Sequence, residues 1–143
     1  MTVRVRVKLS RDGFQVFTVA IANSGYESDS PEIVLPVKAA ERLKLYPELP
    51  AGSRVEEYRG VGGVIVKTFV IRDSVKICVV TGDRESQTVK ATAVITPGED
   101  EVVISDKLID SLGLVLIRSG EGLWRFIDDN GEIVRESLPA EKW

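Results

Sequence analysis

The segment Ile21–Pro36, IANSGYESDSPEIVLP, decides how the fold of this chain is interpreted. Its apolar ends are typical of β-strands, and the polar stretch between them is too hydrophilic for a protein core. That stretch begins with Asn23-Ser24-Gly25. Asparagine tolerates left-handed backbone, and serine and glycine favour bends, so the tripeptide alone predicts an ordinary turn. Its sequence context determines whether the turn has a function.

Length and composition indicate a single globular domain. The chain has 143 residues, of which 43% are hydrophobic and 29% charged, which is enough to form one core. We expect one domain over residues 1–136 and a loosely held C-terminal tail over residues 137–143.

Hydrophobicity and charge along the chain predict a cytoplasmic protein that does not bind nucleic acids. No apolar run is long enough to cross a bilayer, and the first residues alternate charge with valine, so we expect no membrane association and a cytoplasmic protein. The net charge is −3, and the lysines and arginines are spread along the chain. This excludes a general nucleic-acid binder, which needs a basic face, but it does not exclude a small basic peptide as ligand.

The chain has no histidine and one cysteine, Cys78. Ser-His-Asp and Cys-His catalysis are therefore excluded, as are zinc sites built from histidine or from several thiolates. We expect no metal and no cofactor. Cys78 lies in the apolar segment VKICVV, which favours a buried thiol over a reactive one.

Hydrophobic periodicity predicts an all-β barrel or sandwich with about nine strands and two short helices. Alternation over residues 3–9 and β-forming residues over 14–22 predict a hairpin, and Arg4, Arg6 and Lys8 on one face suggest a solvated strand edge. Trp124 and Phe126 alternate like core-facing residues. Further strands are expected at 32–36, 54–71 with a glycine-rich bend, 74–81, 87–95, 102–104, 114–119, 122–127 and 132–136. The helices are expected at 37–45 and after Ser105, a good N-cap, with Gly113 ending the second.

The order of these parts resembles the retropepsin-like aspartic proteases. A strand leads into X-Ser-Gly, a strand ending in Leu-Pro follows, and the helix AAERLKL comes next. EYRGVGGVIV resembles the family's flap hairpin, and EVVISDKLIDSLGLVLI resembles its closing strand and helix. The resemblance covers about Phe14–Phe126 and implies an acid-protease half-barrel that forms a homodimer. The flap or cleft residues it implies are Tyr58, Gly60, Gly62 and Gly63.

The chain departs from this family at the catalytic position. Asn23 stands where the family has its aspartate, although Ser24 and Gly25 are in place behind it. Family members hydrolyse peptides with two carboxylates that share one proton, whereas an amide cannot act as a general base. The chain also carries the inserted segment YESDSPE, and VISD where the family commonly has Leu-Gly.

Three functions remain open at this point. We expect a non-catalytic module that binds an extended peptide or acts in regulation, with Asn23, Ser24 and Gly25 at the degenerate site. One alternative is an active acid peptidase that uses Asp29 or a deamidated Asn23, although Glu27, Asp29 and Glu32 are more simply interpreted as solvated loop carboxylates. The other is an unrelated structural β-barrel that mediates interactions.

Overall fold

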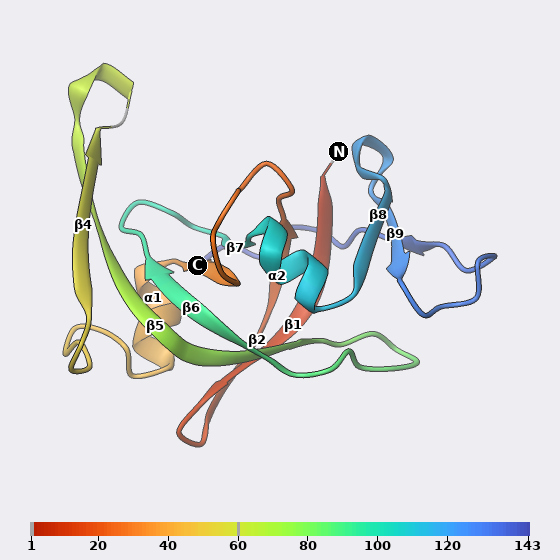
Figure 1. Cartoon of the computed structure of the whole chain (residues 1–143), viewed down its shortest axis with the longest axis horizontal. Coiled ribbons are helices and arrows are strands. Elements are labelled where there is room, and N and C mark those ends of the chain that lie inside the picture. Colours follow the sequence, from red (N-terminus) through yellow and green to blue (C-terminus); the bar gives the residue numbers. More distant parts are fainter. Residues whose placement is uncertain (1, 60) are drawn as a thin grey trace.

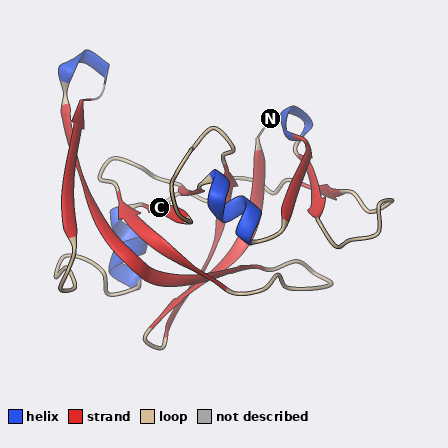
Figure 2. Ribbon diagram, viewed as in Figure 1, coloured by secondary structure: helices blue, strands red, loops and turns tan. Residues whose placement is uncertain are grey.

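The fold is a β-barrel with two short α-helices, as the sequence predicts (Figure 2). The computed structural model describes residues 2–59 and 61–143, and only the backbone of Tyr58 and Val61. The main sheet has seven strands in the order β1-β2-β7-β3-β6-β5-β4, and pairing of β1 with β5 closes it. β4 stays outside the closed ring, and its hairpin with β5 projects from the barrel (Figure 1). A second, three-stranded sheet has the order β10-β9-β8.

The elements follow one another along the chain in nearly the predicted order. None of the helices in the described residues has the length and apolarity needed to cross a bilayer. The bounds are β1 Val3–Arg11, β2 Phe14–Ala22, β3 Glu32–Leu35, α1 Val37–Arg42, β4 Arg54–Arg59, η1 Val61–Gly63, β5 Ile65–Val79, β6 Val89–Ile95, β7 Val102–Ile104, α2 Asp106–Ser111, β8 Leu114–Arg118, η2 Ser119–Glu121, β9 Leu123–Phe126 and β10 Arg135–Glu136.

β1 is an interior strand of the barrel. It pairs with β2 through a tight turn in which Asp12 and Gly13 have φ of 47° and 85°, the backbone that a two-residue hairpin turn requires. It also pairs with β5, with Val7 opposite Val79. The apolar side chains of β1 point inward and are fully buried, namely Val3, Val5, Val7 and Leu9.

The predicted solvated edge at Arg4, Arg6 and Lys8 is therefore wrong. Because β1 has a neighbour on each side, its outward cations lie over the barrel wall, where acidic residues from other segments reach them. Each cation forms an ion pair with a glutamate: Arg4 with Glu101 at 2.8 Å, Arg6 with Glu141 at 2.9 Å and Lys8 with Glu85 at 3.9 Å.

β5 is one long strand where the sequence predicts two. It runs for 15 residues, and its register with β6 shifts between Ile71 and Val75. In this bulge Asp73 has φ of 48°, and its N–H donates to Thr92 Oγ1 at 3.2 Å. The turn-forming residues thus bend the strand without ending it.

Cys78 in β5 is 1% exposed, which confirms the prediction of a buried thiol. Burial raises the pKa of this thiol, since a thiolate is poorly solvated there. Cys78 is therefore a small apolar core residue rather than a nucleophile.

The C-terminal tail is docked, so the expectation of a loosely held tail is wrong. Ser137 Oγ accepts the N–H of Arg4 at 2.7 Å, and the Leu138 N–H donates to the Arg4 carbonyl at 3.0 Å. At the end of the chain, Trp143 Nε1 donates to Thr18 Oγ1 at 3.0 Å. Residues at both ends of the tail thus meet partners on β1 and β2, which no local sequence pattern reveals.

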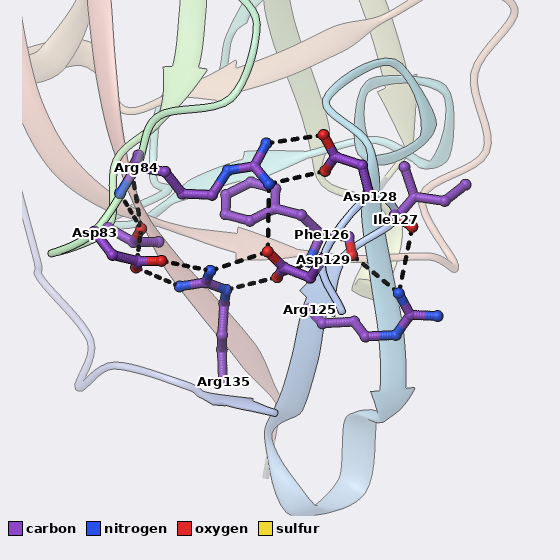
Figure 3. Close-up of polar contacts among 9 residues, drawn as sticks. Asp83, Arg84, Arg125, Phe126, Ile127, Asp128, Asp129 and Arg135 are labelled. Carbon is purple, nitrogen blue, oxygen red and sulfur yellow. Dashed lines mark hydrogen bonds and ion pairs between the residues drawn. The ribbon is translucent and has the colours of Figure 1, made fainter. Parts of the chain in front are cut away.

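A network of ion pairs joins the small sheet to the loop between β5 and β6 (Figure 3). Asp129, whose side chain is 4% exposed, accepts from Arg135 Nε at 2.9 Å and lies 3.3 Å from Arg84 NH1. The Arg84 and Arg135 guanidinium carbons lie 4.2 and 5.0 Å from the centroid of the Phe126 ring. Phe126 and Trp124 are 1% and 3% exposed, which confirms them as core residues.

The hydrogen bond from Arg135 lowers the pKa of the Asp129 carboxyl to about 2, against the opposing effect of burial. A carboxyl whose pKa is lower in the folded than in the unfolded state stabilises the fold when it is ionised in both states. This stabilisation is complete above the unfolded pKa of about 4 and is lost as the pH falls toward 2.

We expect Asp129→Asn to lower the free energy of unfolding at pH 6 by about 3 kcal/mol, because it leaves two arginines short of a buried partner. The difference from the natural chain should shrink as the pH falls from about 4 toward 2. Asp128→Asn is the matched control, since the Asp128 side chain is 67% exposed, and it should change stability little. Urea denaturation at several pH values measures this. An equal loss of stability at every pH would contradict the stabilising role of the ionised Asp129 carboxylate.

Candidate functional site

The loop after β2 folds as a turn built around Asn23. Its N–H donates to the Ile104 carbonyl in β7 at 3.2 Å, and its own carbonyl accepts the Tyr26 N–H at 3.0 Å. The side-chain oxygen Oδ1 accepts the Gly25 N–H at 3.0 Å, which is the geometry of an Asx turn. Asn23, Ser24 and Gly25 are exposed, so the turn presents its residues to solvent.

The start of α2 holds the rest of this loop in place. The Asp106 N–H donates to the Tyr26 carbonyl at 2.9 Å, and Asp106 Oδ1 accepts the Ser28 N–H at 3.1 Å. Ser105 caps α2 as predicted, accepting from Leu108 N–H at 3.3 Å. The same Ser105 oxygen accepts the N–H of Glu32 at 3.0 Å. The VISD segment thus anchors the inserted YESDSPE segment, and the two departures from the family's pattern contact each other.

A groove of about 470 Å³ lies beside the Asn23 turn. Val34 in its wall is paired with Val94 on one side and with Val103 on the other, so three valines form a row across neighbouring strands. In the described part of the chain, no group of three or more histidine, cysteine, aspartate or glutamate residues is placed to hold a metal ion. The groove is lined by Asn23, Tyr26, Val34, Glu56, Thr68, Val94, Thr96, Glu99 and Val103.

Tyr26 and Glu32 form a hydrogen-bonded pair at this groove. The Tyr26 hydroxyl donates to Glu32 Oε1 at 2.7 Å. Burial raises the pKa of Tyr26, and the bond to Glu32 and the charges of Glu32 and Glu56 raise it further. Glu32 is therefore not the solvated loop carboxylate that the sequence suggests, because it lies in β3, is only partly exposed and accepts the hydrogen bond from Tyr26. Glu27 and Asp29 are exposed, as expected.

The structure brings only part of the predicted site together. Asn23 lines the groove, whereas Asp29 is exposed and is not one of its lining residues. Gly62 and Gly63 lie at the tip of the β4–β5 hairpin, with φ of 80° and 77°. The Tyr58 backbone pairs with Val66 in this hairpin, its side chain is not described, and Gly60 lies outside the described residues. The roles given to these residues stay predictions.

Sequence reasoning missed most of the groove. Glu56 comes from β4 and Thr68 from β5, while Glu99 lies in the loop between β6 and β7. These residues are far apart in the chain and belong to no motif. Among the described lining residues other than Asn23, only Val34 carried a usable signal, because the alternation within β3 puts it on the face opposite the buried Ile33 and Leu35.

The closed barrel, the turn after its second strand and the projecting β4–β5 hairpin define a retropepsin-like fold. Among solved structures, the crystal structure of the retroviral protease-like domain of Ddi1 from Leishmania major is similar, with a TM-score of 0.54. The alignment covers 97% of each chain at 13% sequence identity, so the likeness concerns the fold alone. No family model matches the chain, and no curated protein matches it by sequence.

We expect Ser105→Ala to lower the free energy of unfolding by about 2 kcal/mol, because Ser105 is fully buried and its loss leaves the N–H groups of Glu32 and Leu108 without their acceptor. Ser111→Ala is the control. Ser111 lies at the other end of α2 and is partly exposed, and among the described residues its hydroxyl donates only to the Lys107 carbonyl, so its loss should have little effect. Denaturant unfolding distinguishes the two variants, and equal stabilities would show that Ser105 does not anchor the loop.

Proposed function

We propose that this chain is a non-catalytic, retropepsin-like module that binds an extended peptide. One observation carries the proposal: Asn23, which the sequence resemblance aligns with the family's catalytic aspartate, is exposed and lines the groove. A carboxylate there activates water by accepting its proton. The amide of Asn23 has no basic oxygen or nitrogen at ordinary pH, so a peptide in this groove is held without being hydrolysed.

The walls of the groove suit an extended chain. The row of Val34, Val94 and Val103 offers an apolar strip to alternate side chains of a peptide. β4 ends the order of the main sheet and is paired only with β5 among the described strands, so its outer edge has backbone groups free to pair with an added strand. Both features bind peptide without any reacting group.

The rival function is an acid peptidase. Asp29 is a poor candidate, because it lies outside the groove lining and precedes Ser30-Pro31 rather than Ser-Gly, and proline removes a backbone N–H. Deamidation of Asn23 would create an aspartate at this position. Any activity test must therefore verify that residue 23 is still an asparagine. A structural barrel with no ligand is the remaining alternative.

We also propose that the chain forms a homodimer. In the retropepsin-like family each copy supplies half of the site, and the groove of this chain is open to solvent. β8 ends its sheet and is paired only with β9 among the described strands. Its Ile117 is 41% exposed, so β8 offers both a strand edge and an apolar side chain to a second copy.

We expect Asn23→Asp to cleave an unfolded protein such as reduced, carboxymethylated albumin at acid pH, and the natural chain to leave it intact. The new carboxylates would meet across the dimer axis and share a proton. Asn130→Asp is the matched control, because Asn130 is exposed and also accepts a nearby backbone N–H, that of Glu132 at 3.1 Å. Gel electrophoresis of the substrate gives the rate of cleavage. Mass spectrometry of the intact natural chain verifies that Asn23 has not been deamidated.

Two results would contradict this account. Cleavage by natural chain of verified mass would show an active peptidase that uses another acid. Absence of cleavage by an Asn23→Asp variant that light scattering shows to be dimeric would show that Asn23 does not occupy the catalytic position.

A further inference from the structure

We infer that the groove beside Asn23 selects a cationic segment, an extended peptide in which lysine or arginine alternates with apolar residues. This inference rests on the proposed function and adds the chemistry of the ligand. Among the described residues that line the groove, Glu56 and Glu99 are carboxylates and none is a lysine or arginine. The valine row supplies the apolar floor, and the glutamates are contributed by different walls.

The groove carboxylates are weakly neutralised by the chain itself. Among the described residues, Glu56 forms one ion pair, with Arg54 at 3.6 Å, and the Glu56 and Arg54 side chains are 56% and 59% exposed. Exposed pairs of this kind contribute little and are readily exchanged. Glu99, the other groove carboxylate, forms no ion pair with a lysine or arginine of the described residues.

Other glutamates of the barrel behave differently. Glu101 follows the groove residue Glu99 by two positions in the sequence. Its side chain is 8% exposed and forms ion pairs with Arg4 at 2.8 Å and with Lys142 at 3.2 Å. The charge of Glu101 is therefore neutralised by Arg4 and Lys142 of the chain itself. Glu99, two residues earlier, is exposed and lines the groove. Glu101 thus helps to hold the C-terminal tail, whereas Glu99 is available to a ligand in the groove.

Geometry favours a peptide over a small cation. Val34, Val94 and Val103 stand side by side on three adjacent strands, an apolar strip that a simple metal or amine ion would leave uncovered. In an extended peptide, side chains alternate between two faces. Apolar residues on one face can cover the valines while the long lysine stems on the other reach out to the glutamates at the sides.

Binding of fluorescein-labelled Val-Lys-Val-Lys-Val tests the inference by fluorescence anisotropy. The same peptide with both lysines acetylated keeps the shape and removes the charge. We expect the lysine peptide to bind about tenfold more tightly than the acetylated one and to weaken as sodium chloride rises. The variant Glu56→Gln/Glu99→Gln should lose this preference.

Glu48→Gln/Glu132→Gln is the matched control. It removes the same charge from exposed positions outside the groove and should keep the preference, and circular dichroism verifies the fold of both variants. Equal binding of the two peptides to the natural chain would overturn the inference and leave peptide binding intact. Equal loss in the control variant would also overturn it, since net charge alone would then explain the effect. Binding of neither peptide would contradict the proposed function itself.

Discussion

Closure of the barrel by pairing of β1 with β5 is the constraint on which the rest of the structure depends. Val7 opposite Val79 and Leu9 opposite Ile77 join the first strand to the long strand in the middle of the chain. The closed ring then fixes β7 between β2 and β3. This order brings the end of β2, the start of β3 and the start of α2 to one place. The Asn23 turn and the groove lie there because the barrel closes.

The Asn23 turn owes its shape to contacts that an amide and a carboxylate provide equally well. Oδ1 of Asn23 accepts the Gly25 N–H, and an aspartate oxygen in the same place would accept it too. The backbone of Asn23 is held by Ile104 in β7, whatever its side chain. Replacing aspartate by asparagine therefore removes the proton chemistry and leaves the loop geometry unchanged. On the proposed function, this is the physical reason why the groove holds a peptide without hydrolysing it.

Much of the fold could be predicted from local sequence, and the site could be predicted only in part. The Asp12-Gly13 turn, the Ser105 cap and the buried Trp124 and Phe126 follow from turn chemistry, capping and alternation. The joining of two expected strands into β5 could not be foreseen, because Asp73-Ser74 resembles a turn and is accommodated as a bulge. Nor could docking of the tail, because its bonds depend on distant partners. The groove glutamates belong to separate segments that only barrel closure brings together.

The proposed function requires that an intact peptide occupies the groove beside Asn23. The most direct measurement is a titration of the ¹⁵N-labelled natural chain with the lysine-containing peptide, followed in amide correlation spectra, with mass spectrometry of the recovered peptide. We predict saturable shifts at Gly25, Val34, Val94 and Val103, and a peptide of unchanged mass. Shifts confined to other faces of the barrel, or recovery of peptide fragments, would contradict the account.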